Sequence, residues 1–231
     1  MKLKLEQTQK WLNEAQMLLN KLSSCGQPGV CTFKQGDIEG CERVDYDDSD
    51  WKRVMGKGVP IPGISTDSVA VESKKEEDLE LCDWSMYDGT AAMRKKLVVP
   101  EYIEGLSTEG TKVYITLTML APLDIYIDGT KVASYKYWGD SRHCELVVTE
   151  EHKPGKDYVI VFRTPQNDGD AHLGVYINYR VVEDAMLDLA TAIEQIKFAN
   201  ELYIRNPEPV LKKALSDLDA LLATDCITTR N

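Results

Sequence analysis

The sequence predicts a mainly β protein: an antiparallel β-sandwich of the jelly-roll kind, with helices before and after it. Residues 94–182 contain at least six short strand patterns, separated by turns every 8 to 12 residues and with no helical pattern between them. The two ends of the chain instead repeat apolar residues at three- and four-residue steps. We therefore expect an N-terminal helix in 1–26, the sandwich in 27–183 and a helical annex in 184–231.

The N-terminal helix is predicted over residues 2–22. Its apolar positions form one broad face, as in an amphipathic packing helix, and they are Leu5, Trp11, Leu12, Ala15, Leu18, Leu19 and Leu22. The helix should end within Ser23 to Gly26, because Pro28 and Gly29 forbid its continuation.

Residues 30–85 are rich in turn residues, with glycines and prolines interrupting every periodic run. This composition predicts long loops that run over the surface of the sandwich. The almost wholly charged run from Glu72 to Glu80 predicts a solvated loop or edge.

Alternating or continuous apolar runs then mark the strands of the sandwich. They are Val113 to Leu120, Leu123 to Asp128, Cys144 to Thr149, Tyr158 to Thr164 and Leu173 to Val182, after a first strand near residue 94. Asp128-Gly129 between two of these runs is a strong signal for a tight β-hairpin.

After Val182 the apolar period changes to that of a helix. One helix is predicted from Ala185 to Leu202, and Pro207 stops it. A second is predicted over 209–222, with Leu211, Leu215, Leu218 and Leu222 along one side.

Composition narrows the classes of function. The 231 residues carry a formal net charge of −11, and this negative field repels phosphate backbones, so nucleic acid is not an expected partner. No apolar run approaches the length of a membrane span, and the first six residues lack the apolar region of a signal peptide. We expect a cytoplasmic protein that does not enter a membrane.

The six cysteines are spaced irregularly, and none forms a Cys-x-x-Cys pair. We expect reduced thiols, as is usual for a cytosolic protein. A structural zinc at Cys25, Cys31 and Cys41 is the alternative, although these spacings are wider than those of typical zinc ligands and no histidine lies among them.

Four sequence blocks, in order, carry a resemblance to a known family. The stretch Tyr46-Asp47-Asp48-Ser49-Asp50-Trp51 resembles the "F/Y-D-D-S-x-W" motif of the galactose-binding-like, sugar-binding jelly roll that precedes the catalytic domain of many large glycoside hydrolases. Residues 88–100 resemble its "G-x-A-W-Y-R-K-x-F-x-V-P" strand, with Met93 where the family has an aromatic residue. Residues 123–132 are similar to its "V-Y-V-N-G-K-x-V" hairpin, and residues 154–161 to its "P-G-x-N-x-I-x-V" strand.

Two features resemble the α-mannosidases of glycoside hydrolase family 38: the helices that flank the jelly roll, and the "D-x-x-H-x-E" pattern of residues 140–145. The resemblance implies a non-catalytic domain, because neither a catalytic barrel nor a His-x-Asp metal motif is present among these residues. We expect no catalytic residues and no cofactor in this chain, and a divalent metal such as zinc only in a catalytic domain elsewhere. The implied partner is the rest of its own polypeptide, and a homo-oligomer remains open.

Candidate carbohydrate-binding residues combine aromatic rings with planar polar groups, which suit the apolar face and the hydroxyls of a pyranose. One group follows the predicted hairpin and comprises Tyr135, Tyr137, Trp138, Asp140 and Arg142. A second group precedes the strand near residue 94 and comprises Trp84, Tyr87 and Asp88. The alternative is that Tyr135 and Tyr137 are strand residues and that Trp138 and Trp84 pack against the core.

One further turn, from Asn167 to Asp170, offers the oxygen ligands Asp168 and Asp170 to calcium, although a plain hairpin turn uses the same residues. Two other functions remain open at the level of sequence. One is an autonomous carbohydrate-binding module, and the other is an interaction domain whose helices, with Leu211 and Leu215, dock onto another chain.

Overall fold

The structure is a computed structural model, and it describes residues 2–26, 29–56, 89–119, 122–136, 144–164 and 173–205. The chain divides into two compact units. One comprises residues 24–181 and contains every strand found among the described residues, and the other comprises residues 1–23 and 182–231. We describe each unit by itself.

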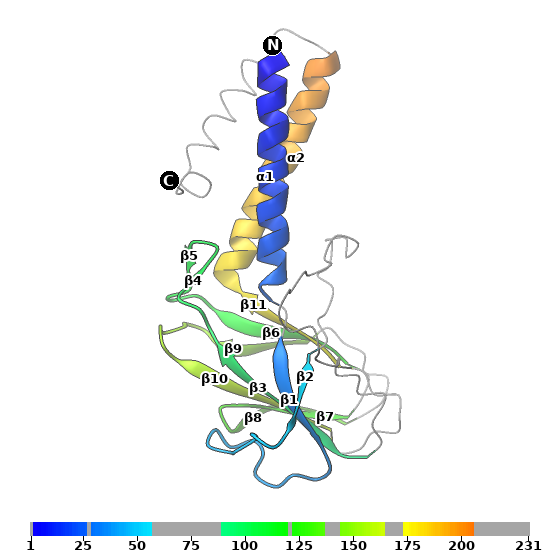
Figure 1. The fold of residues 1–231 in the computed structure, drawn as a ribbon, viewed down its shortest axis with the longest axis vertical. Helices are drawn as coiled ribbons and strands as arrows, with labels where there is room; N and C mark the ends of the chain where they lie inside the picture. The colour runs from blue at the N-terminus through cyan, green and yellow to red at the C-terminus, as the bar shows by residue number, and fades with distance from the viewer. Residues whose placement is uncertain are drawn as a thin grey trace. The chain divides into compact units, whose positions relative to one another are not determined.

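The strands form antiparallel sheets, so the predicted antiparallel β-sandwich with flanking helices is confirmed (Figure 1). The larger sheet has six strands in the order β2-β1-β3-β10-β7-β8, the smaller sheet has the order β11-β6-β9, and β4 and β5 form a separate hairpin. The bounds are β1 Val30–Gln35, β2 Lys52–Met55, β3 Ala91–Val98, β4 Tyr102–Ile103, β5 Leu106–Ser107, β6 Val113–Met119, β7 Leu123–Ile127, β8 Thr130–Tyr135, β9 Cys144–Thr149, β10 Asp157–Thr164 and β11 Leu173–Tyr179.

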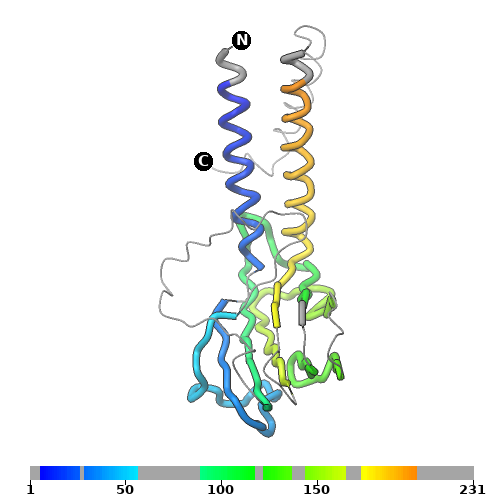
Figure 2. Tube along the Cα trace, turned by 90° about the vertical axis from the view of Figure 1, so that its right-hand side faces the viewer, coloured from blue at the N-terminus to red at the C-terminus, as the bar shows by residue number. Residues whose placement is uncertain are grey.

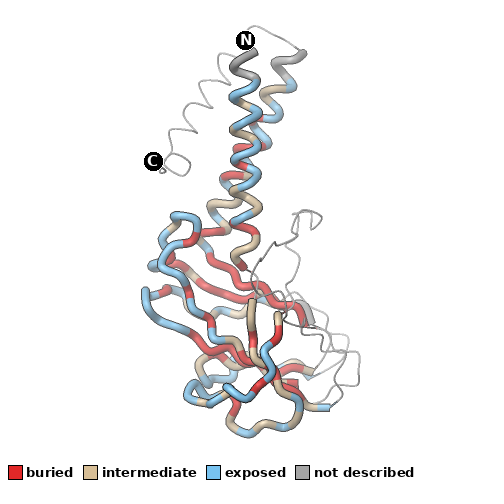
Figure 3. Tube along the Cα trace, in the orientation of Figure 1, coloured by how far each residue is buried: buried red, intermediate tan, exposed pale blue. Residues whose placement is uncertain are grey.

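Buried residues run along the strands of both sheets, as the red stretches of the trace show (Figure 3). In the six-stranded sheet, Met93 of β3 lies opposite Phe33 of β1 and Phe162 of β10, and all three are buried. In the smaller sheet, Ile115 of β6 and Ile177 of β11 are paired and buried in the same way. Met93 is therefore a core residue, which explains why an apolar side chain suffices at a position where the family has an aromatic ring.

The predicted Asp128-Gly129 hairpin is confirmed between β7 and β8. Asp128 and Gly129 have φ angles of 48° and 79°, the pair of positive values that a type I′ turn requires. Asp128 also ties this turn to β10, because its carboxylate accepts a hydrogen bond from the Val159 N–H at 2.9 Å. The turn is thus held by its own geometry and by a neighbouring strand.

Two sequence predictions differ from the structure. The stretch after Val30, predicted as surface excursions, contains β1 and β2. The predicted strand from Leu173 to Val182 ends at Tyr179, where α2 begins at once. The reason lies in residues far away in sequence: the Thr111 hydroxyl accepts a hydrogen bond from the Val181 N–H at 3.1 Å, and the Lys112 carbonyl accepts one from the Arg180 N–H at 3.0 Å.

In the helical unit, α1 (Lys2–Ser24) and α2 (Arg180–Arg205) run side by side in opposite directions (Figures 1 and 2). Ala15, Leu189 and Ile193 form the buried seam between them, flanked by Trp11, Leu12, Leu18 and Leu19. All of these residues belong to the apolar periods of the predicted helices, but Leu187 and Phe198, which belong to the same period of α2, are exposed. Neither helix holds a segment long and apolar enough to cross a bilayer. The helix predicted over 209–222 lies outside the described residues.

Candidate functional site

The acidic turn that carries the resemblance lies on the outer face of the six-stranded sheet, between β1 and β2. Thr32 of β1 and Arg94 of β3 are paired across the sheet, and both side chains reach the same carboxylate. The Thr32 hydroxyl donates to Asp48 Oδ2 at 2.5 Å, and Arg94 Nε donates to the same oxygen at 3.1 Å. Asp48 therefore fastens the turn to two neighbouring strands.

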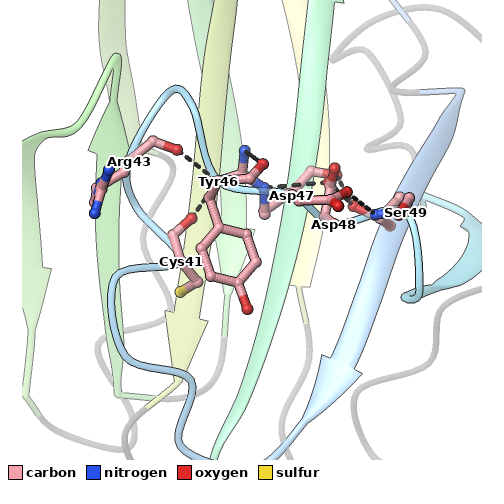
Figure 4. Close-up of polar contacts among 8 residues, drawn as sticks. Cys41, Arg43, Tyr46, Asp47, Asp48 and Ser49 are labelled. Atoms are coloured by element: carbon pink, nitrogen blue, oxygen red, sulfur yellow. Dashed lines mark hydrogen bonds and ion pairs between the residues drawn. The ribbon is translucent and has the colours of Figure 1, made fainter.

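Arg94 is the centre of this arrangement, and its hydrogen-bond partners Cys41, Arg43, Tyr46 and Asp48 are the labelled residues to follow in Figure 4. Its side chain is only 5% exposed, and its guanidinium donates hydrogen bonds to the backbone carbonyls of Cys41, Arg43 and Tyr46, the last two at 3.1 and 3.4 Å. The guanidinium carbon also lies 5.3 Å from the centre of the Tyr46 ring, a cation–π geometry. Five donors in a rigid fork suit arginine to satisfying several acceptors of one loop at once.

Apolar contacts complete the anchorage of this loop. Trp51 packs edge-to-face on Tyr46, with ring centres 5.7 Å apart. Together with Cys41 they pack against Ala92 of β3 and against Val159 and Val161 of β10. The six-stranded sheet thus has a second, smaller core on its outer face, built by the residues of the motif.

Two other acidic residues of the turn, Asp47 and Asp50, also have polar partners. Asp47 accepts a hydrogen bond from the Ser49 N–H at 3.0 Å, and hydrogen bonds from Ser49 lower the pKa of Asp47. Asp50 forms an exposed ion pair with Lys34 at 2.7 Å. Asp47 thus holds the turn itself, and Asp50 links the turn to β1.

Only one of the predicted carbohydrate-binding residues lies in the described part of the chain. Tyr135 ends β8, opposite Leu123 of β7, as the alternative interpretation of a strand residue requires. Burial and the neighbouring Cys144 thiol raise the pKa of Tyr135 to about 12. Tyr137, Trp138, Asp140, Arg142, Trp84, Tyr87 and Asp88 lie outside the described residues, as do the calcium candidates Asp168 and Asp170, and these sites stay predictions.

The cysteines do not assemble a metal centre in the part of the chain that is described. Cys25, Cys31, Cys41 and Cys144 are not in disulfides. No group of three or more His, Cys, Asp or Glu side chains that could hold an ion is found among the described residues, so the zinc alternative has no support there. Cys31 and Cys41 are buried, and burial raises the pKa of both thiols, to about 11 for Cys31.

A cavity of about 540 Å³, which the sequence analysis did not anticipate, lies within the sandwich unit. Its lining comes from β3, β11, the β4–β5 hairpin and the turn after α1; the residues are Cys25, Lys95, Lys96, Leu97, Val98, Pro100, Tyr102, Ile103, Glu104, Ile177 and Tyr179. No contiguous motif could have revealed it, because these segments meet only when the sheets form. The one local signal was Glu104-Gly105, whose φ angles of 48° and 87° mark a tight turn that carries a carboxylate to its tip.

Comparisons with known proteins give a limited picture. No family model and no curated protein match the chain. Among solved structures, it is similar to a glycosyl hydrolase family 2 member from Bacteroides cellulosilyticus, with 17% identity, a TM-score of 0.43 and coverage of 67% of this chain and 20% of the other. A β-glycosidase from Bacteroides vulgatus has 16% identity and a TM-score of 0.42, with coverage of 65% and 19%. A β-glucuronidase from Bacteroides uniformis has 17% identity and a TM-score of 0.41, with coverage of 66% and 17%.

The chain therefore spans about a fifth of the length of these glycoside hydrolases. None of the three is described as a family 38 α-mannosidase, so the family 38 assignment depends on the sequence resemblance alone. At these identities and TM-scores the similarity carries no conclusion about activity or substrate.

Proposed function

We propose that this chain is a non-catalytic β-sandwich domain of a glycoside hydrolase. The observation that carries the proposal is the contact of Asp48 with Arg94, at 3.1 Å beneath the loop that bears the motif. The acidic residues that the chain shares with the sugar-binding jelly roll are engaged in fastening one loop to one sheet. A carboxylate that acts as acid, base or nucleophile must instead face a substrate across a cleft.

The finer part of the proposal concerns substrate and partner. On the sequence resemblance, the domain supports a catalytic domain of the same polypeptide in the hydrolysis of mannosides, in the cytoplasm, and a divalent metal such as zinc belongs to that catalytic domain. The sandwich contributes a rigid surface, because its loop over the outer face is fixed by a buried arginine. Such a surface is suited to packing against a second domain or shaping the rim of its active site.

The purified chain, assayed with nitrophenyl glycosides, tests the non-catalytic role. The panel comprises the α-mannoside with and without zinc or cobalt, the β-glucuronide and the β-glucoside. We expect no turnover above that of a heat-unfolded sample. Turnover that follows the folded fraction of the protein would contradict the proposal.

The gene beyond Asn231 tests the partner. We expect an open reading frame of several hundred codons that encodes a catalytic barrel, with a His-x-Asp metal motif if the substrate is a mannoside. A barrel with paired glutamates and no such motif would retain the supporting role and refute the mannosidase part. A stop codon directly after Asn231 would refute the supporting role within one polypeptide.

A further inference from the structure

The cavity lined by β3, β11 and the β4–β5 hairpin has the dimensions of a ligand site. Its volume of about 540 Å³ falls within the range of about 300–1,000 Å³ that is typical of small-molecule sites. All of its lining residues belong to the unit of residues 24–181. It is separate from the loop held by Arg94, because no residue of that loop is among the lining residues.

The floor of the cavity is apolar and rigid. Leu97, Ile103, Ile177 and Tyr179 are all buried, and Leu97 and Ile177 stand on β3 and β11, one strand from each sheet. A floor built from strands keeps its shape without a ligand, so binding does not require these groups to be ordered first.

The rim of the cavity, by contrast, exposes large apolar side chains to solvent. Tyr102 on β4 is 59% exposed and Val98 on β3 is 60% exposed, although most large apolar residues of this unit are buried. An exposed tyrosine ring at the mouth of a cavity offers a flat apolar surface with a hydroxyl at its edge. It suits a ligand that has one apolar face and polar groups around its edge.

Polar groups of both kinds converge on the cavity. Lys95 Nζ donates to the Val30 carbonyl at 3.0 Å, which fixes the ammonium while its other protons can serve further acceptors. Burial, and to a smaller extent the charge of the Cys25 thiolate, raises the pKa of Tyr179 to about 12, so its phenol remains a hydrogen-bond donor. Burial raises the pKa of the Cys25 thiol, and the nearby Glu104 carboxylate, an acceptor, raises it further.

The charges of the lining oppose each other. Lys96 is paired with Asp157 at 3.0 Å, and the lining contains one further cation, Lys95, and one carboxylate, Glu104. The cavity therefore has no excess of one sign to select a phosphate or a carboxylate, and it has donors and an acceptor for hydroxyl groups. These properties favour a neutral ligand that bears several hydroxyls.

We propose that this cavity binds a neutral pyranoside, with an apolar face of the sugar against Tyr102 and its hydroxyls directed to Lys95, Tyr179 and Glu104. This inference goes beyond the proposed function and does not depend on it, because a supporting domain needs no sugar site of its own. The site is also distinct from the predicted carbohydrate-binding residues around Trp138 and Trp84. One exposed ring and a few hydrogen bonds correspond to weak binding, with a Kd of about 1 mM.

The test is a titration of the whole chain followed by amide chemical shifts in two-dimensional NMR. The probes are mannobiose, cellobiose and lactose, each raised to about 20 mM, which is well above the expected Kd of about 1 mM. We expect at least one of them to shift the amide signals of Cys25, Glu104, Gly105 and Tyr179 in a saturable way. No shift with any of the three, or shifts confined to residues outside the lining, would overturn the proposal.

Two variants separate a specific site from general surface binding. Tyr102→Ala should weaken binding about fivefold, equivalent to about 1 kcal/mol, while Tm is unchanged because the side chain is exposed. Val98→Ala should weaken it less, and the matched control Val132→Ala, an exposed valine of β8, should leave it unaltered. Equal affinity in the wild type and Tyr102→Ala would refute the stacking arrangement, and preferential binding of mannose 6-phosphate or glucuronate would refute the neutral ligand class.

Discussion

Replacement of Arg94 by methionine removes the donor that holds the loop over the six-stranded sheet. Methionine retains an unbranched apolar chain, is shorter than arginine because it lacks the guanidinium, and donates no hydrogen bonds. The backbone carbonyls of Cys41, Arg43 and Tyr46 and one oxygen of Asp48 then lose a partner. Leaving a buried acceptor without a partner costs about 1–3 kcal/mol, and breaking a buried ion pair on one side costs about 3–5 kcal/mol.

The structure places the expected cost at the lower end of that range. Asp48 is 32% exposed, so its carboxylate can recover hydrogen bonds to water once Arg94 is gone. We expect a loss of about 3 kcal/mol in the free energy of unfolding. For a unit of this size, that corresponds to a fall in Tm of about 6–12 °C.

Lys131→Met is a matched control. Lys131 also combines an ion pair, to Asp124 at 2.7 Å, with a cation–π contact, to Tyr126 at 5.5 Å, but its side chain is 45% exposed and it binds no backbone carbonyl that we observe among the described residues. Exposed pairs contribute about 0–1 kcal/mol, so this variant should lose little. The comparison isolates the effect of burial and of the carbonyl contacts.

Urea unfolding and amide hydrogen exchange are the assays. In Arg94→Met, exchange should rise chiefly in residues 41–51 of the loop, and the urea midpoint should fall. Asp48→Asn should cost less, because the amide oxygen can still accept from Thr32 and Arg94. If Arg94→Met and Lys131→Met lose the same free energy, or if exchange in the loop is unchanged, the argument that Arg94 anchors the motif is wrong.

Three further predictions concern other contacts of the sandwich unit. Gly26→Ala places a Cβ 2.1 Å from Tyr176 Cζ and 2.4 Å from the Ile177 carbonyl oxygen, so it should lower the free energy of unfolding by at least about 2 kcal/mol, measured by thermal unfolding. In the control Gly105→Ala the new Cβ has open space around it, so the loss should come only from the strain of the positive φ. Asp128→Ala should cost about 1–2 kcal/mol in urea unfolding through the lost bond to the Val159 N–H, and Asp128→Asn, which tolerates the same φ, should lose less than the alanine variant. Burial lowers the pKa of His152, so the unfolded chain binds a proton at a higher pH than the folded chain does. The contribution of His152 to stability should therefore be constant above the unfolded pKa of about 6.5 and should decline as the pH falls below it. In urea midpoints measured from pH 7.5 to 5, His152→Gln should remove this decline.

The elements that the sequence predicts well are those whose determinants are local. The β7–β8 hairpin depends on two adjacent residues, Asp128 and Gly129, and the packing faces of α1 and α2 follow from the apolar period. In each case a short window of the chain contains both the pattern and its cause. Strand β1 also alternates, with Cys31 and Phe33 buried and Thr32 and Lys34 on the other face, but the turn residues around it conceal so short a run.

The elements that the sequence does not predict depend on residues far away along the chain. Arg180 to Val182 looks like the end of a strand because valines favour strands, but Thr111 and Lys112 bind the first N–H groups of a helix there. The cavity is a similar case, because its lining comes from four separate segments. Sequence patterns report the neighbours of a residue in the chain, and both features are decided by neighbours in space.

Strand β3 illustrates how alternation changes the meaning of a motif. Arg94-Lys95-Lys96 is the largest basic cluster of the sequence, and in solution such a triplet would act as one positive patch. In the sheet, Arg94 is buried beneath the loop after β1, Lys95 reaches the Val30 carbonyl at the cavity, and Lys96 pairs with Asp157. Each of the three charged side chains makes a different contact, so the triplet does not form a single basic patch that could bind a polyanion. Instead, β3 contributes one side chain each to the loop, to the cavity and to the sheet.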